Sequence, residues 1–232
     1  MIDFQELQEG LQDPNIFKAF FLAGGPGSGK SFVVRKTTGG TGLRSVNSDD
    51  AFEAMLDKAG LSQKMPASEE EPREVIRQKS KAITKKRESN YIEGRIGLVI
   101  DGTGKEYDKI AAQSTKLKQL GYDTHMIFVN TSLDVALQRN AERARTVPER
   151  IATQSWKAVQ SNMGKFSQHF RRNMIIVDNN DVKEDDGTLF NDVFKQIKSL
   201  LGRPVNNPTA REWVRMEMKR RGIDKPPKGW RV

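Results

Sequence analysis

The chain has 232 residues, enough for one large domain or two small ones with a core that needs no disulfide or metal. It contains no cysteine and two histidines, which excludes disulfide frameworks, thiolate zinc sites and cysteine nucleophiles. No apolar run approaches the roughly 18 residues that cross a bilayer, and the amino terminus lacks a secretory signal, so we expect a cytoplasmic protein that does not enter membranes. The net charge of +9 favours anionic partners.

Short apolar runs alternate with longer stretches of helical period along residues 1–202. The expected strands are 19–23, 45–47, 97–100, 124–129 and 173–177. The expected helices are 31–37, 50–59, 72–93, 106–120, 132–145, 149–169 and 189–201. This alternation predicts an α/β fold, in which a central, mostly parallel five-stranded sheet lies between two layers of helices.

Much of the positive charge lies in residues 203–232, which contain nine basic and three acidic residues, a net charge of +6. We therefore divide the chain into one domain, 1–202, and a basic extension, 203–232. Residues 209–221 are expected to form a helix that is capped by Thr209 and docks through Trp213 and Met216. Three interpretations remain open for the extension: contact with nucleic acid, a basic helix docked on an acidic body, or an extension that aids solubility.

A glycine-rich loop follows the first strand and matches the pattern G-x-x-x-x-G-K-[ST] in full. Such a loop wraps a polyphosphate with inward-pointing amides, which requires residues without a Cβ. Lys30 is expected to reach the β- and γ-phosphates, and the Ser31 hydroxyl to bind Mg²⁺. The residues expected to contact the nucleotide are Gly24, Gly25, Pro26, Gly27, Ser28, Gly29, Lys30, Ser31 and Phe32. The alternative is a turn that merely joins a strand to a helix.

Two carboxylates, Asp49 and Asp50, follow the second strand. Because ligands bind at the carboxyl ends of parallel strands, these side chains are expected to face the phosphates. Phosphoryl transfer to a hydroxyl group needs a carboxylate that aligns the hydroxyl and accepts its proton, and we assign that role to Asp49. The alternative is that Asp49 or Asp50 only caps the next helix.

The third strand leads into Asp101, followed by Gly102, Thr103 and Gly104. An apolar strand that ends in an aspartate is typical of the carboxylate that supports magnesium or orients the substrate in a nucleotide site. The two glycines would let a substrate approach the backbone closely. A tight turn would explain the glycines but not the aspartate.

A basic lid is expected over residues 139–150, near Pro148. Arginines there could neutralise the charge that develops on the transferred phosphoryl group. Arg143 and Arg145 are the first candidates, ahead of Arg139 and Arg150. The alternative is a solvated helix face on which Glu142 pairs with its neighbours.

Taken together, these motifs resemble those of the zeta-toxin-like and polynucleotide-kinase-like P-loop kinases, over about residues 20–150. The glycine loop looks like their phosphate-binding loop, and residues 46–50 (VNSDD) look like the segment whose first aspartate is the catalytic base, here Asp49. Residues 101–108 (DGTGKEYD) resemble the zeta-toxin segment that contacts the acceptor, which usually has glutamate where this chain has Asp101. Residues 137–148 (LQRNAERARTVP) look like the arginine lid.

The resemblance implies a P-loop kinase that uses ATP and Mg²⁺ to phosphorylate a hydroxyl of a nucleotide, nucleotide sugar or nucleic acid. It places Asp101 and Thr103 at the acceptor and the catalytic arginine at Arg143 or Arg145, and it suggests an inhibitor protein as a partner. Two rivals remain: a nucleic-acid-binding protein switched by ATP, which uses the basic tail, and an ATPase without an acceptor. A GTPase is less favoured because the chain has no N-K-x-D motif.

Overall fold

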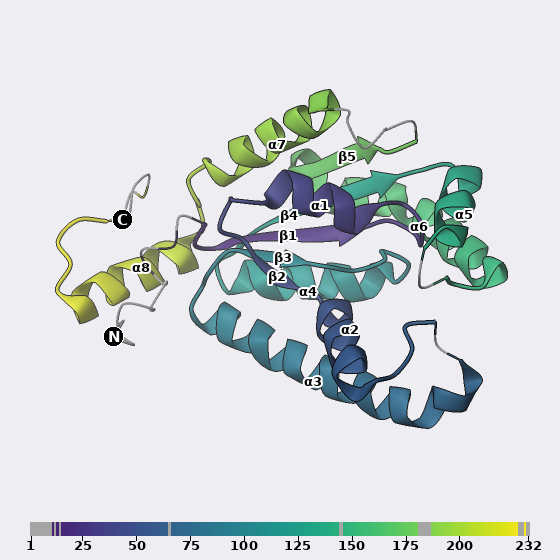
Figure 1. The fold of residues 1–232 in the computed structure, drawn as a ribbon. Coiled ribbons are helices and arrows are strands. Elements are labelled where there is room, and N and C mark those ends of the chain that lie inside the picture. The colour runs from purple at the N-terminus through teal and green to yellow at the C-terminus, as the bar shows by residue number, and fades with distance from the viewer. Residues whose placement is uncertain are drawn as a thin grey trace.

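The computed structural model describes residues 11, 13, 15–64, 66–143, 146–180, 187–226 and 230. Its centre is a sheet of five strands, all parallel, in the order β2-β3-β1-β4-β5 (Figure 1). The strands are β1 (Lys18–Ala23), β2 (Arg44–Val46), β3 (Leu98–Ile100), β4 (Asp123–Asn130) and β5 (Met174–Asp178). The strand before the glycine loop is thus central, and the predicted α/β class and strand count are confirmed.

Every predicted helix is present. The helices are α1 (Lys30–Thr38), α2 (Ser48–Ala59), α3 (Glu70–Glu93), α4 (Tyr107–Gln119), α5 (Leu133–Ala141), α6 (Glu149–Phe170), α7 (Gly187–Leu201) and α8 (Pro208–Arg221), with short 3₁₀ turns at Ala67–Glu69 and Arg171–Asn173. The prediction for α5 was too long, because the helix ends at Ala141 rather than at residue 145. The buried Asn140 side chain binds both backbone groups of Val147, which turns the chain away from the helix axis.

The alternation of side chains along the central strands explains the three layers. In β1, Phe20 and Leu22 point to one face, where they pack with α1 and α7. Ala19, Phe21 and Ala23 point to the other face, towards α4 and α6. Because both faces are covered, all six residues of β1 are buried, which is why the strand reads as a continuous apolar run after Lys18.

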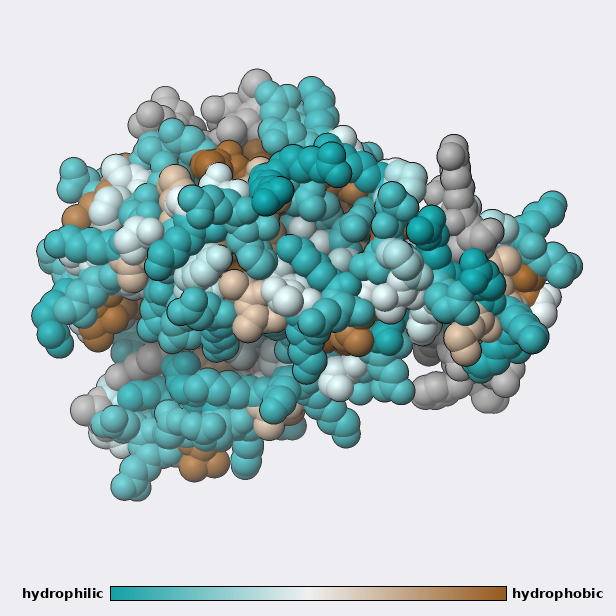
Figure 2. Space-filling view, turned by 180° about the vertical axis from the view of Figure 1, so that it is seen from behind, coloured by the Kyte–Doolittle hydropathy of each residue, from teal (hydrophilic) through white to brown (hydrophobic). Residues whose placement is uncertain are grey.

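Helices α2 and α3 form a hairpin with a small core of its own. Phe52, Leu56 and Ile76 are its buried members, and they belong to neither of the two clusters that cover the sheet. The carboxyl-terminal part of α3 joins the hairpin to the body, where Gln113 of α4 donates a hydrogen bond to Glu88 (2.6 Å). Most other residues of α3 are exposed to solvent, and Figure 2 shows the hairpin from behind as a largely hydrophilic ridge.

Helix α8 packs against the body at the end of the sheet opposite α5 (Figure 1). Its side chains Ala210 and Val214 are fully buried, and the Trp213 ring lies edge-on to Phe17, with 5.4 Å between ring centroids. Asn207, not Thr209, caps the helix by accepting a hydrogen bond from the backbone amide of Thr209.

The prediction that α8 docks through Trp213 and Met216 is correct for one of the two residues. Trp213 docks, but Met216 is 65% exposed and points to solvent. Trp230 also packs on Phe17. Within the described residues, no helix is both long enough and apolar enough to span a bilayer.

A substitution at Trp213 tests whether α8 is part of the folded body. Trp213→Ala removes an aromatic contact with the core and should lower the free energy of unfolding by about 3 kcal/mol. Met216→Ala is the matched control on the same helix and should change it by less than about 0.5 kcal/mol, because Met216 is exposed. Urea denaturation measures both values, and equal effects would contradict the docking of α8.

His125 lies in the middle of the apolar face of β4 and is 2% exposed. Its ring stacks on Phe20, and neither ring nitrogen has a hydrogen-bond partner among the described residues. Burial, together with the nearby Lys18 ammonium, lowers the pKa of His125 to about 3. The residue is therefore a neutral core side chain.

This burial predicts a specific dependence of stability on pH. Because the unfolded histidine binds a proton near pH 6.5 and the folded one does not, the free energy of unfolding should fall as the pH drops from 6.5 towards 3. The contribution of this residue approaches about 1.4 kcal/mol per pH unit. His125→Leu should abolish it, so urea denaturation of the two proteins should diverge between pH 6.5 and 5. Parallel curves would show that His125 titrates normally in the folded protein.

Candidate active site

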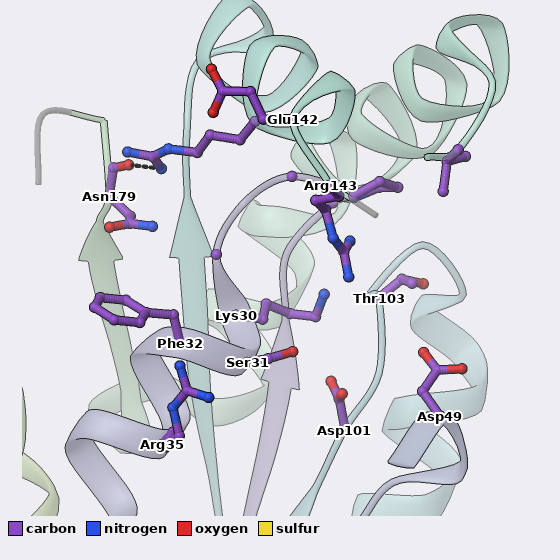
Figure 3. Close-up of a pocket in the computed structure, with 16 residues that line it drawn as sticks. Lys30, Ser31, Phe32, Arg35, Asp49, Asp101, Thr103, Glu142, Arg143 and Asn179 are labelled. Carbon is purple, nitrogen blue, oxygen red and sulfur yellow. Dashed lines mark hydrogen bonds between the residues drawn. The ribbon is translucent and has the colours of Figure 1, made fainter. Parts of the chain in front are cut away.

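A cavity of about 760 Å³ lies at the carboxyl edge of the sheet, where the loops after β1 and β3, the start of α2 and the segment after α5 converge (Figure 3). This edge is where ligands bind in open parallel sheets. The lining residues are Gly25, Pro26, Gly27, Gly29, Lys30, Ser31, Phe32, Arg35, Asp49, Asp101, Thr103, Arg139, Glu142, Arg143, Val147 and Asn179.

Two glycines of the loop are packed tightly against neighbouring segments. A Cβ on Gly27 would lie 1.9 Å from the Ala136 carbonyl oxygen of α5, and one on Gly29 would lie 2.4 Å from the Asn179 amide nitrogen. Both glycines also have a φ near +80°, a conformation that disfavours other residues. These contacts fix the loop against α5 and against the end of β5.

Of the nine residues predicted to contact the nucleotide, seven line the cavity. Gly24 and Ser28 do not: both are buried behind the loop. The Gly24 amide donates a hydrogen bond to the Thr103 carbonyl (2.9 Å), which ties the glycine loop to the loop after β3. The Ser28 carbonyl accepts a hydrogen bond from the Asn179 side chain (2.8 Å). These two residues support the loop rather than face the cavity.

Lys30 and Asp101 are charged groups of opposite sign that have both lost much of their solvent. Burial lowers the pKa of Lys30, and the Arg143 guanidinium lowers it further, while Asp101 and Asp49 oppose this shift. Burial likewise raises the pKa of Asp101; Lys30 opposes this rise, whereas Asp49 and Asp50 add to it. The site thus holds a cation and an anion that would each be stabilised by a bound ligand of opposite charge.

The side chains present fit a magnesium ion that arrives with a nucleotide. One carboxylate oxygen of Asp101, Oδ1, is buried and has no hydrogen-bond partner among the described residues. Figure 3 shows this carboxylate beside the Ser31 hydroxyl, and oxygen ligands of these two kinds suit Mg²⁺. Within the described part of the chain, no group of three His, Cys, Asp or Glu side chains could hold a metal without help. Phosphate oxygens would therefore have to complete the coordination.

Asp49 lines the cavity on the wall opposite the glycine loop, near Thr103 (Figure 3). It lies in the first turn of α2, but it is not the cap: the Asn47 side chain accepts the hydrogen bond from the Asp49 amide (2.8 Å). Asp50 is exposed and its carboxylate accepts a hydrogen bond from the Asn47 amide group (3.0 Å). Asn47 therefore caps α2, and capping does not explain the position of the Asp49 carboxylate at the cavity.

The segment after α5 brings arginines to the cavity. Arg143 lines it, and Figure 3 shows its guanidinium directed towards Lys30. Arg139 lines it as well, but its guanidinium donates hydrogen bonds to the carbonyl oxygens of Asn179 (2.6 Å) and Asn180 (3.2 Å). Arg145, the other candidate for the catalytic arginine, lies outside the described residues.

Four lining residues were not anticipated from the sequence as contacts: Arg35, Glu142, Val147 and Asn179. Asn179 follows the last strand, so its position at the carboxyl edge was available as a signal. Arg35 lies one turn after Phe32 on α1, and this spacing could also have placed it at the cavity. Nothing in the sequence marks Val147, whose place depends on the hydrogen bonds to Asn140.

The fold and the cavity are those of a P-loop kinase. Residues 6–188 match the family model described as zeta toxin, so the chain belongs to the zeta toxin family. The comparison with curated proteins found no match.

Solved structures share the fold at low sequence identity. A gluconokinase from Sinorhizobium meliloti 1021 is 12% identical with a TM-score of 0.50, and the match covers 81% of this chain and 95% of that one. The AvrRxo1-ORF1:AvrRxo1-ORF2 complex with sulphate ions is 14% identical with a TM-score of 0.54, covering 82% of this chain and 71% of that one. The same complex has also been solved with ATP, with a TM-score of 0.52 and 14% identity over 82% and 70% of the two chains.

The tight packing of the glycine loop can be tested without any knowledge of the acceptor. Gly27→Ala would force the loop and α5 apart, so ATP affinity measured by calorimetry should fall by at least about tenfold, the equivalent of 1.4 kcal/mol. Gly164→Ala is the control, because a Cβ there meets no atom within 4 Å. It should leave ATP affinity unchanged. Unchanged affinity in Gly27→Ala would contradict the packing described above.

Proposed function

We propose that the protein is an ATP- and magnesium-dependent kinase that transfers the γ-phosphoryl group to a hydroxyl of a nucleotide, nucleotide sugar or nucleic acid. The observation that carries this proposal is that one cavity holds the phosphate-binding loop on one side and Asp49 on the other. Membership of the zeta toxin family and the kinase folds among the solved neighbours support it. The ATP in a neighbouring complex supports ATP as the donor.

The triphosphate would lie in the glycine loop, with its β- and γ-oxygens on the Lys30 ammonium. The loop amides and the amino end of α1 add positive potential there. A magnesium ion held by Ser31 and Asp101 would supply further positive charge at the phosphates. Binding would relieve the unfavourable burial of Lys30, because the phosphate oxygens stabilise its protonated form.

The acceptor hydroxyl would lie between the γ-phosphate and Asp49, near Thr103. Asp49 aligns the hydroxyl and takes its proton as the new bond forms between the acceptor oxygen and the γ-phosphorus. The bond from that phosphorus to the β,γ-bridging oxygen breaks, and ADP leaves. Arg143, which lines the cavity, neutralises the charge that develops on the transferred phosphoryl group. An inhibitory partner protein remains a prediction of the family resemblance.

The base assignment can be tested with a matched pair of neighbouring carboxylates. Asp49→Asn should lower kcat by about 10²–10⁴-fold and leave ATP affinity unchanged, because only proton removal and alignment are lost. Asp50→Asn is the control and should keep most of the activity, since that exposed carboxylate does not line the cavity and accepts a hydrogen bond from the cap residue Asn47.

The assay uses γ-labelled ATP with a pool of nucleotides, nucleotide sugars and 5′-hydroxyl oligonucleotides, followed by identification of the labelled product. If Asp49→Asn transferred phosphate at the wild-type rate, Asp49 would not be the base. Hydrolysis of ATP without any labelled product would favour an ATPase instead.

A further inference from the structure

The exposed part of α3 carries an unusual concentration of one charge. Residues 75–87, the basic segment, contain six basic side chains and no acidic one between Glu74 and Glu88. These side chains are Arg77, Lys79, Lys81, Lys85, Lys86 and Arg87. All but Arg77 are exposed to solvent, and Arg77 lies over the Phe52 ring at 4.2 Å.

These cations differ from three arginines of the basic extension, which have carboxylate partners. On α8, Arg215 pairs with Glu212, while Arg220 and Arg221 both pair with Glu217. Within the described residues, no ion pair involves any cation of the basic segment. The extension is thus partly neutralised by its own acids, whereas the basic segment of α3 is not.

The spacing of the basic residues makes this arrangement unfavourable for the helix itself. Arg77, Lys81 and Lys85 follow one another at intervals of four residues, so they form a row along one side of α3, and like charges at this spacing repel. Each step of four residues rises about 6 Å along the axis, so the row spans about 12 Å. A row of this kind is stabilised when a polyanion lies along it.

We propose that the basic segment of α3 binds the phosphate backbone of a nucleic-acid strand. Protein interfaces usually centre on buried apolar or aromatic anchors, and this row has none. The exposed apolar residues Val75 and Ile83 lie off this row, beside Lys79. A membrane surface would need a broad apolar face, and these two are the only exposed large apolar side chains on α3 among the described residues. A strand of phosphates needs only the charges, and none of these cations is in an ion pair within the described part of the chain.

One end of the row contacts the helix that carries Asp49. Arg77 lies over the ring of Phe52, which lies three residues after Asp49 on α2. Binding along α3 does not depend on phosphoryl transfer. It would hold equally whether the nucleic acid is the acceptor or a separate ligand.

The test is the salt dependence of binding to a fluorescein-labelled single-stranded oligonucleotide of 20 nucleotides, followed by fluorescence anisotropy. The double variant Lys81→Gln, Lys85→Gln should bind about tenfold more weakly at 0.1 M salt. The slope of log K against log salt should be less steep by about 1.4, because two phosphate contacts are lost from a single strand. Its melting temperature should not fall, since the change removes repulsion between exposed side chains.

Arg215→Gln, Arg220→Gln is the matched control: it removes the same charge from exposed, ion-paired positions of α8 and should leave both the affinity and the slope as in the wild type. Equal losses in the two double variants would overturn the proposal in favour of diffuse attraction by net charge. An unchanged slope in the α3 variant would also overturn the proposal. The same holds if polyglutamate, at an equal concentration of charge, competes as strongly as the unlabelled oligonucleotide. Failure of the kinase assay alone would leave these binding results intact.

Discussion

The absence of space around the glycine loop is the constraint on which the site depends. A Cβ on Gly27 would collide with the backbone of α5, and a Cβ on Gly29 would displace the side chain of Asn179. The loop is therefore held at once by α5, by the end of β5 and, through Gly24, by the loop after β3. One set of contacts brings together three segments that are far apart in the sequence, and the cavity is what lies between them.

In the proposed function, the burial of Lys30 and Asp101 would favour binding of an anion and a cation together. The lowered pKa of Lys30 and the raised pKa of Asp101 have the same cause, which is loss of water around a charge. Each group is poorly solvated by the protein alone. A magnesium-bound triphosphate would supply the opposite charge to both, so the cost of burying them in the free protein becomes a preference for the ligand.

Much of the fold could be predicted from the sequence, because β1 and β4 are buried on both faces and so appear as plain apolar runs. The glycine pattern likewise identified the loop and the edge of the sheet at which the cavity lies. Position at the carboxyl edge sufficed to place Asp49 and Asp101 at the cavity. What could not be predicted depends on tertiary contacts: the end of α5 is set by Asn140, and the place of Val147 follows from it.

The net charge of a segment was the least reliable guide from the sequence to the surface of the folded protein. Residue counts pointed to the carboxyl-terminal extension as the basic surface, yet counts do not show which cations already have partners. The acids of α8 lie at helical spacing from its arginines, whereas those of α3 flank its basic segment on either side. The number of unpaired cations on a face, not the net charge of a segment, is what a polyanion would meet.

The most direct test of the central claim is a crystal structure with a non-hydrolysable ATP analogue and Mg²⁺. The γ-phosphate should contact Lys30, and the Asp49 carboxylate should lie roughly 5–6 Å from the γ-phosphorus, the room that one hydroxyl oxygen needs to meet both groups. A γ-phosphate directed away from α2, or an Asp49 carboxylate turned out of the cavity, would contradict the account.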